Sequence, residues 1–239
     1  MFKTAGVSSF RTEHLDALQL LSLTEGVKNE SLQNLAIYSQ FQRFRAGVFV
    51  FDCGQTPDGV YLVMEGMVSL LAPDLEGKMH VAEVFGPGNL LGDLGLIWGS
   101  AYGVCAKTIR PSLLMKIPSA AMLKAIQNDG EFGMRIMGEH SRRIRSLLQR
   151  VGYYATDSSI ARVASYLLNL PIKEVDGNEC VKLPIPKHLA ASLLNLSSEA
   201  FSRSLRSLKD KDLISVSKED IVFISRQKLE DLLSNASTL

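Results

Sequence analysis

The side chains with the most distinctive hydrogen-bonding chemistry lie between residues 184 and 209. Arg203 carries a planar fork of donors that fits the O6 and N7 atoms of guanine. Glu199 can only accept hydrogen bonds, which suits the amino group of cytosine, and Ser202 can bond either a base edge or a phosphate. Because these side chains follow one another at helical spacing, they indicate readout of a DNA groove.

Two short helices around a tight turn are needed to present these side chains. Pro186 stands where the first helix would start, and Ser197 can cap the second by accepting a backbone N–H bond. Asn195 tolerates the left-handed backbone angles that a tight turn between helices requires. The pattern predicts a helix-turn-helix followed by a two-stranded wing over residues 213–224. The residues expected to contact DNA are Ser198, Glu199, Ser202, Arg203, Arg206, Lys209 and Lys187.

Within this set, Lys187, Arg206 and Lys209 are expected to contact phosphates, which position the helix without reading sequence. The alternative interpretation is an ordinary helical hairpin in which Glu199 and Arg203 form a solvated ion pair one turn apart. The predicted wing and a long upstream helix favour the DNA-binding interpretation, because a dimer places two recognition helices about one duplex turn apart.

The longest helical pattern covers residues 131–156 and carries a narrow apolar seam. Its members recur at alternating steps of 4 and 3 residues, which is the spacing of core positions in a coiled coil. A helix packed only on its own domain would show a wider stripe, so the seam favours a parallel dimer. The polar member, His140, is interpreted as a register residue, with a role as a ligand as the alternative. The predicted seam consists of Met137, His140, Ile144, Leu147 and Val151.

From about Phe41 the sequence changes to a strand-like pattern. Short runs rich in β-branched and aromatic residues are separated by turn residues, including a turn expected at Glu65-Gly66, and they predict an all-β sandwich or barrel. Before them, short helices are expected over residues 12–39, one of them capped by Asn29. The expected strands are 49–51, 60–64, 67–71 and 80–85, with one more between the Arg-Pro pair at 110–111 and the Ile-Pro pair at 117–118.

Composition sets the broad class of the protein. The chain has 239 residues, of which 46% are apolar and 21% charged, with a formal net charge of +1, and this fits two modest globular domains or one large one. The first twenty residues do not have the pattern of a signal peptide, so none is expected, and no run of about 18 uncharged apolar residues occurs. The sequence therefore predicts a cytoplasmic protein without a membrane span. Cys53, Cys105 and Cys180 lie far apart in the sequence, so neither a disulfide framework nor a metal site is expected.

The order of a β-domain, a long helix and a winged helix-turn-helix resembles that of the CRP/FNR family of bacterial transcription regulators. The resemblance covers about residues 30–233, and the recognition helix matches the family pattern Glu-x-x-Ser-Arg. The motifs that carry it are Arg43-Phe44-x-x-Gly47, Gly54-x-x-Pro57-Asp58-x-Val60-Tyr61-Leu62-Val63, Gly66, Gly88-x-x-x-Gly92-Asp93 and Ser198-Glu199-Ala200-Phe201-Ser202-Arg203.

The resemblance implies an α+β fold with an N-terminal cyclic-nucleotide-binding-like β-roll (jelly roll), a long dimerisation helix and a C-terminal winged helix-turn-helix. The corresponding parts are an effector-sensing domain at 1–130, the dimerisation helix at 131–156 and the DNA-binding domain at 157–239. It further implies a cytoplasmic homodimer without enzymatic activity, with double-stranded DNA and RNA polymerase as partners. By resemblance to members with Glu-x-x-Ser-Arg, the target is expected to resemble TTGAT-N4-ATCAA.

The expected effector is not cyclic AMP. Family members that bind cyclic nucleotides place a Gly-Glu-Leu turn and then an Arg-Ser or Arg-Thr pair against the phosphate. Here Gly92-Asp93-Leu94 stands in for the turn, and no arginine occurs between Arg45 and Arg110. That segment carries seven acids and two bases, whereas a phosphate diester needs a fixed cationic fork or a nest of donors.

The cofactor is left open, with haem as a candidate. Members with an iron–sulfur cluster carry a closely spaced N-terminal group of cysteines, which this chain lacks. Some members without either signature sense nitric oxide or carbon monoxide through haem, and the recognition helix resembles that of the nitric-oxide-responsive FNR/DNR branch. No axial ligand can be chosen among the cysteines, the methionines and the four histidines, His14, His80, His140 and His188.

Two other functions are considered beside this one. The first is a regulator that responds to a cyclic nucleotide through a rebuilt pocket. The second is a metal enzyme of the cupin type, which would need clustered histidines on neighbouring strands. Since His80 is the only histidine between residues 41 and 139, the sequence favours a regulator over an enzyme.

Overall fold

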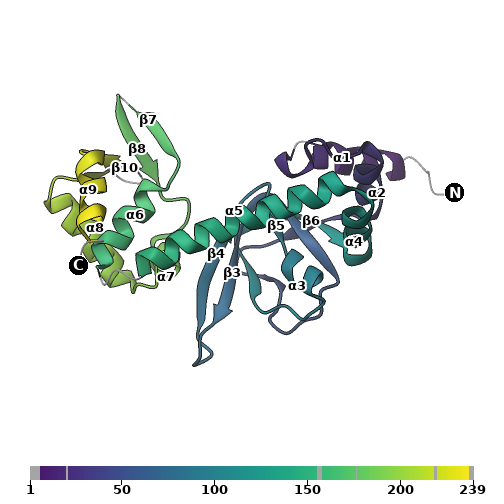
Figure 1. Ribbon diagram of the computed structural model, residues 1–239, viewed down its shortest axis with the longest axis horizontal. Helices are drawn as coiled ribbons and strands as arrows, with labels where there is room; N and C mark the ends of the chain where they lie inside the picture. The colour runs from purple at the N-terminus through teal and green to yellow at the C-terminus, as the bar shows by residue number, and fades with distance from the viewer. Residues whose placement is uncertain (1–5, 20, 155–157, 176, 218–219, 237–239) are drawn as a thin grey trace. The chain divides into compact units, whose positions relative to one another are not determined.

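The computed structural model describes residues 6–19, 21–154, 158–175, 177–217 and 220–236 (Figure 1). The chain divides into two compact units, Met1–Arg143 and Ile144–Leu239. The boundary between them falls within the 25-residue helix α5, Gly130–Tyr154. None of the helices in the described ranges combines the length and the apolar character needed to cross a bilayer.

The first unit is a β-sheet domain flanked by helices. Its elements before α5 are α1 (Gly6–Gln19), η1 (Ser22–Thr24), α2 (Asn29–Tyr38), β1 (Gln40–Phe44), β2 (Phe49–Phe51), β3 (Gly59–Pro73), β4 (Met79–Phe85), β5 (Leu90–Leu91), α3 (Asp93–Trp98), β6 (Cys105–Pro118) and α4 (Ser119–Asn128). The strands pair antiparallel in the order β1-β6-β3-β4, with β2 on β6 and β5 on β3. Helices α1, α2 and α4 lie together at one end of the unit (Figure 1).

Two clusters of buried side chains stabilise this unit. One joins the helices to the sheet and includes Leu35, Leu62 and Phe132, each at most 2% exposed. The other gathers around Phe51 and Tyr61 on the strands. The N-terminal β-domain with flanking helices that the sequence predicts is therefore confirmed.

Strand β3 runs straight through the turn expected at Glu65-Gly66. Its register with β6 shifts on both sides of Glu65, which is typical of β-bulges. Gly66 has a φ of +91°, and a Cβ at this position would lie 2.6 Å from the Cα of Ser112. Ser112 also accepts a hydrogen bond from the Met67 N–H at 3.1 Å, so β6 lies too close for any larger residue. The predicted turn is wrong, because glycine marks bulges and close backbone approach as well as turns.

Strand β6 begins earlier than expected. The Arg-Pro pair at 110–111 lies inside the strand rather than at its start. Pro111 falls where the register with β3 shifts, and a proline is tolerated at such a break because the regular ladder is already interrupted.

The Asp129 carboxylate accepts hydrogen bonds at the starts of two helices, α2 and α5. Lys28 is the N-cap of α2, so the prediction that Asn29 caps this helix is wrong. The Lys28 N–H and the Ser31 hydroxyl donate instead to Asp129 Oδ2, at 2.9 and 2.8 Å. Asp129 Oδ1 accepts from the Phe132 N–H at 3.4 Å, in the first turn of α5. Burial raises the pKa of Asp129, but these donors outweigh burial and hold the pKa below its ordinary value.

Replacing Asp129 with asparagine should lower the free energy of unfolding by about 1 kcal/mol at pH 7, because both helices lose an anionic cap. A carboxylate whose folded-state pKa is lowered stabilises the fold above its ordinary pKa of about 4, and this contribution is lost as the pH falls through the lowered value. The difference between the parent and Asp129→Asn in urea unfolding should therefore be smaller at a pH well below that ordinary pKa than at pH 7.

The matched control for this change is Ser31→Ala. It removes one hydrogen bond to the same carboxylate without removing a charge, so its own effect should be small at neutral pH. If parent and Asp129→Asn differ equally at both pH values, the ionised cap contributes nothing and the interpretation is wrong.

The second unit contains helices and one sheet. Its elements after α5 are α6 (Ser159–Leu168), β7 (Ile172–Val175), β8 (Asn178–Lys182), α7 (Lys187–Leu193), α8 (Ser198–Asp210), β9 (Ile214–Ser217), β10 (Asp220–Phe223) and α9 (Arg226–Ala236). The strands pair antiparallel in the order β7-β8-β10-β9. The wing predicted over residues 213–224 is confirmed as the β9–β10 pair. The hairpin β7–β8 was not expected, although Gly177, with a φ of +75°, marks its turn.

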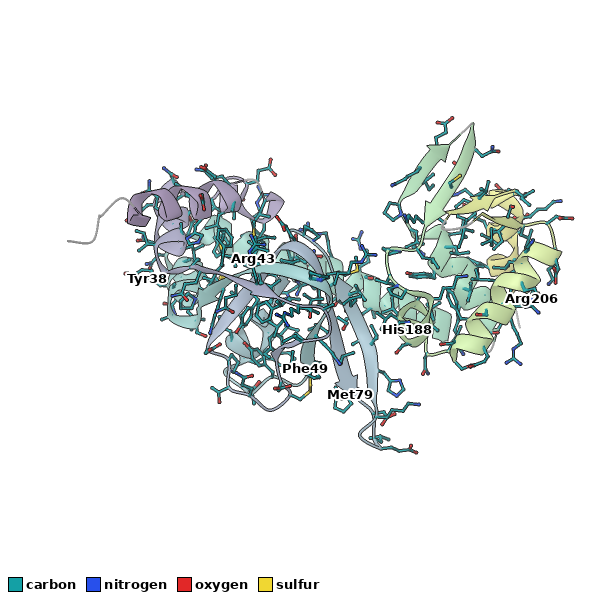
Figure 2. The ribbon with its side chains drawn as sticks, turned by 180° about the vertical axis from the view of Figure 1, so that it is seen from behind. Tyr38, Arg43, Phe49, Met79, His188 and Arg206 are labelled. Atoms are coloured by element: carbon teal, nitrogen blue, oxygen red, sulfur yellow. A yellow bond between two sulfur atoms is a disulfide. The ribbon has the colours of Figure 1, made fainter. Side chains whose placement is uncertain are left out.

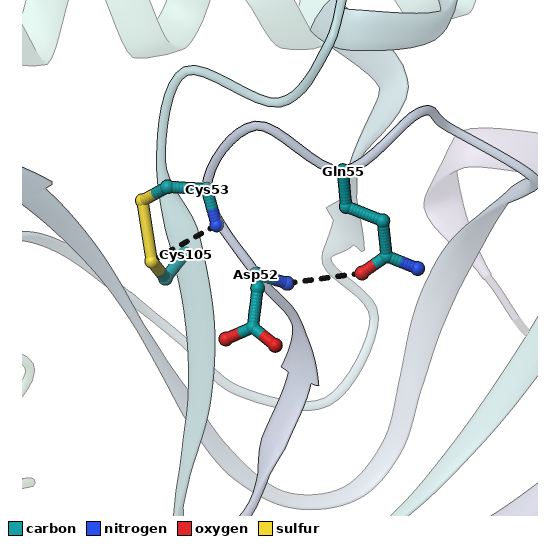
Figure 3. The surroundings of a disulfide bond; sticks show 4 residues. All are labelled: Asp52, Cys53, Gln55 and Cys105. Carbon is teal, nitrogen blue, oxygen red and sulfur yellow. Dashed lines mark hydrogen bonds between the residues drawn. A yellow bond between two sulfur atoms is a disulfide. The ribbon is translucent and has the colours of Figure 1, made fainter.

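Two cysteines of the first unit form a disulfide, Cys53–Cys105 (Figure 3). Their Cα atoms lie 4.7 Å apart although 52 residues separate them in the sequence. The pairing of β2 with β6 brings them together, since Phe51 lies opposite Ala106. The expectation that the cysteines do not pair is therefore wrong, because distance along the chain conceals contacts across a sheet. Cys180, in the second unit, is buried and free.

Candidate functional site

Helices α7 and α8 form the predicted helix-turn-helix. Asn195, in the turn between them, has a φ of +53°, which is the left-handed conformation expected for it. The Leu196 N–H donates to the Ala191 carbonyl at 2.9 Å and closes the turn. Ser197 caps α8 by accepting a hydrogen bond from the Ala200 N–H at 3.1 Å. The predicted turn residue and cap are both confirmed.

The inner face of α8 is fixed by the core of the second unit. Phe201, Leu205 and Leu208 are at most 5% exposed. Ser204, which is 2% exposed, donates its hydroxyl to Ser159 Oγ on α6 at 3.1 Å. These contacts fix the rotation of α8 about its axis, so its outer face presents a defined set of side chains.

That outer face carries the side chains predicted to contact DNA. All seven are exposed, six of them on α8 and one, Lys187, at the start of α7. Figure 2 labels Arg206 on α8 and His188 on α7, and both side chains are exposed. The structure therefore brings the predicted set to the surface, and its contact with DNA stays a prediction.

The alternative ion pair between Glu199 and Arg203 is not formed. In the described part of the chain these two side chains share no hydrogen bond or ion pair. Glu199 instead bonds with its own backbone N–H and with the Ser197 hydroxyl; these bonds lower its pKa, and the charge of Arg203 adds to the effect. Glu199 is therefore an anionic acceptor at neutral pH, and the Arg203 guanidinium stays available for another partner.

In the first unit, a buried carboxylate meets a cation from α5. Asp93, at the start of α3, is 4% exposed, and Arg143 Nη1 lies 3.3 Å from its Oδ2. Arg143 Nη2 also donates to the Leu90 carbonyl at 2.6 Å, and the guanidinium carbon lies 4.9 Å from the centre of the Phe85 ring. The sequence pattern did not indicate this cation, because Arg143 follows Asp93 by 50 residues.

His140, one turn before Arg143 on α5, also faces this carboxylate. Its Nε2 lies 3.6 Å from Asp93 Oδ2 and is buried, without a hydrogen-bond partner among the described residues. His140 is therefore directed at its own unit. No group of three or more metal-ligating side chains occurs there or elsewhere in the described ranges.

Helix α5 carries an exposed apolar stripe. The exposed residues on this helix follow a slightly different line from the predicted seam. They step by 3, 4, 3 and 4 residues and pass through the exposed Ser141 instead of His140, from Met134 to Leu148. The side chain of Val151, predicted as a seam member, lies outside the described residues. The stripe, between 45% and 67% exposed, consists of Met134, Met137, Ile144, Leu147 and Leu148.

Two sequence profiles cover most of the chain. The profile of the cyclic nucleotide-binding domain matches residues 41–129, and that of the Crp-like helix-turn-helix domain matches residues 161–232. The chain belongs to the CRP/FNR family. It is a transcription regulator with a DNA-binding helix-turn-helix, as the order of its elements led us to expect.

Individual relatives support this assignment. The regulator is 24% identical over 170 residues to the probable transcriptional regulator flp of Lacticaseibacillus casei, across 71% of this chain and 77% of that protein. It is 26% identical over 173 residues to the cAMP-activated global transcriptional regulator CRP of Salmonella typhimurium, across 71% and 82% of the two chains. The structure of FixK2 from Bradyrhizobium japonicum has the same fold, with a TM-score of 0.69 at 20% identity over 81% of this chain and 96% of FixK2.

Proposed function

We propose that this regulator binds DNA as a homodimer, reads a palindromic site resembling TTGAT-N4-ATCAA and responds to an effector other than cyclic AMP. The outer face of α8 carries the proposal, because its base-reading and phosphate-binding side chains are exposed together on a helix that the core fixes from behind. RNA polymerase is the expected protein partner of the DNA-bound dimer.

Each side chain on this face suits a different part of the duplex. Arg203 is proposed to donate to a guanine, Glu199 to accept from a cytosine, and Ser202 and Ser198 to bond base edges or phosphates near the helix start. Lys187, Arg206 and Lys209 are proposed to contact phosphates. Selection from random duplexes by the full-length protein tests this function: we expect an inverted repeat with half-sites about 34 Å apart, and recovery of no repeat overturns the proposal.

A second copy of α5 is the proposed cover for the apolar stripe. Exposed apolar side chains at coiled-coil spacing favour pairing of two such helices. Because His140 turns toward Asp93, we propose that the seam passes through Ser141 at that level and through Ile144, Leu147 and Leu148 beyond it. Dimerisation would then present two recognition helices to one palindrome.

The contacts of Arg143 argue against a cyclic-nucleotide effector. Its guanidinium is already engaged by the Asp93 carboxylate and the Leu90 carbonyl, so a nucleotide phosphate would have to displace one of them. Haem is the other effector considered, and a histidine nitrogen would have to bind its iron. His140 Nε2 is buried without a hydrogen-bond partner among the described residues, but it faces the Asp93 carboxylate at 3.6 Å, so His140 does not fit as a haem ligand in this arrangement.

Calorimetric titration of the purified regulator with cyclic AMP should therefore show no saturable heat. Absorption spectra recorded after addition of haem, and then of nitric oxide, test whether the regulator senses a gas through haem. A Soret band that shifts with nitric oxide supports gas sensing, whereas absence of the band points to another small molecule as the effector. Saturable binding of cyclic AMP would contradict the proposal and favour a rebuilt nucleotide pocket.

A further inference from the structure

The disulfide lies where two loops of the first unit are held together. The Gly54 N–H donates to the Tyr102 carbonyl at 2.8 Å, and the Tyr102 N–H donates to the Gln55 carbonyl at 2.9 Å. Together with the bridge, these bonds hold the loop after β2 beside the start of β6. Because the Cα atoms of Cys53 and Cys105 lie 4.7 Å apart, within the usual span of a disulfide, the bridge can form and open without a large movement of the backbone.

The two sulfur atoms have different surroundings. Cys53 is exposed, whereas Cys105 is 8% exposed. The backbone N–H of Cys53 donates to Cys105 Sγ at 3.1 Å (Figure 3), and a donor at this position stabilises a thiolate on Cys105 once the bridge is open. A thiol in solution can therefore attack Cys53, the exposed residue of the pair, with Cys105 as the leaving group.

A short chain of contacts leads from the bridge to α5. The Tyr102 ring stacks on Phe51 with 3.9 Å between ring centroids, and its hydroxyl donates to the Gly59 carbonyl at 2.8 Å. The Tyr102 side chain packs on the start of α3 so closely that a Cβ on Gly92 would lie 3.1 Å from its hydroxyl oxygen and a Cβ on Gly95 would lie 3.0 Å from its ring.

Asp93 lies between those two glycines, and its carboxylate holds Arg143 of α5. A change in the loops that fix Tyr102 therefore reaches the residue that joins the sheet domain to the helix proposed for dimerisation. All of these contacts lie within the first unit.

We propose that Cys53 and Cys105 form a redox-sensitive dithiol–disulfide pair that regulates DNA binding through Tyr102, Asp93 and Arg143. This regulation rests on the proposed DNA-binding function. In a reducing compartment the pair would rest as two thiols and become oxidised under oxidising conditions.

The oxidant is a low-molecular-weight disulfide of the glutathione type. The Cys53 thiolate attacks one of its sulfur atoms, which forms a mixed disulfide and releases one small thiol. The Cys105 thiolate then attacks the Cys53 sulfur, which closes the bridge and releases the second small thiol. Two electrons and two protons pass from the protein thiols to the reagent, so two protein thiols and one small disulfide give one bridge and two small thiols.

The full-length regulator should be equilibrated at several ratios of reduced to oxidised glutathione. Alkylation and mass spectrometry then measure the fraction bridged, and fluorescence anisotropy measures affinity for the selected palindrome in the same samples. We expect the affinity to change with the fraction bridged, by at least about 5-fold between the two states. The affinity of Cys53→Ser and of Cys105→Ser for the palindrome should not change with the glutathione ratio, because neither variant can form the bridge. The affinity of Cys180→Ser should change with the ratio as that of the parent does, because Cys180 is not part of the bridge.

The two measurements separate the possible failures. If no ratio produces the bridge, the proposed redox site is wrong. If the bridge forms and the affinity does not change, the site is redox-active but the proposed regulation is wrong. If neither state binds DNA, the DNA-binding function itself fails together with its regulation, while alkylation still shows whether the bridge forms.

Discussion

Replacing both Ile144 and Leu147 with alanine should dissociate the proposed dimer at low micromolar concentration. The two side chains are 56% and 45% exposed on one chain, and pairing of two α5 helices would bury them. Truncation of a buried aliphatic side chain to alanine costs about 2 to 5 kcal/mol, and each of the two changes would occur twice in a dimer. Sedimentation equilibrium of parent and variant measures the result directly.

The matched control is Ser146→Ala. Ser146 is exposed on the same helix but lies away from the seam in the registers through either His140 or Ser141, so this variant should stay dimeric. A double variant that remains as dimeric as the parent would show that α5 does not form the interface.

Arg203→Ala should weaken binding to the palindrome by about 1 to 3 kcal/mol per half-site and remove the preference for guanine at the position it reads. The physical reason is that alanine lacks the donor fork, while the fixed inner face of α8 prevents a neighbouring side chain from taking its place. Anisotropy with the selected site and with sites substituted at the guanine gives both quantities.

Lys209→Ala is the control, because Lys209 is proposed to contact a phosphate and to position the helix without reading the base sequence. It should weaken binding to all sequences alike and make the dependence on salt concentration shallower, because one phosphate contact is lost. Unchanged selectivity in Arg203→Ala would mean that this side chain does not read the duplex and would favour the helical-hairpin interpretation.

The features that the sequence predicted well depend on neighbours a few residues away. The left-handed turn at Asn195, the cap at Ser197 and the β9–β10 wing each follow from local backbone preferences and spacing. The exposure of the α8 side chains follows from the period of its apolar residues, Phe201 and Leu205 among them. Local chemistry therefore sufficed for most of the DNA-binding face.

The features that were missed depend on partners far along the chain. The residue that excludes a side chain at Gly66 is 46 positions away, at Ser112, and Arg143 lies 50 positions after Asp93. The two bridged cysteines are 52 positions apart. One sequence without its fold contains no local signal for such contacts, so the surroundings of the Asp93 carboxylate could not be predicted.

The shared cap at Asp129 has a consequence for synthesis on the ribosome. The Lys28 N–H at the start of α2 donates to Asp129, which lies 101 positions later in the chain. Strand β1 likewise pairs with the distant β6, where Gln40 lies opposite Lys116. At about 5 to 20 residues per second, these partners emerge several seconds after the segment that needs them. We therefore expect the N-terminal helices to reach their final packing only after the last strand of the sheet has left the exit tunnel, so that the first unit folds as one block rather than from its N-terminus onward.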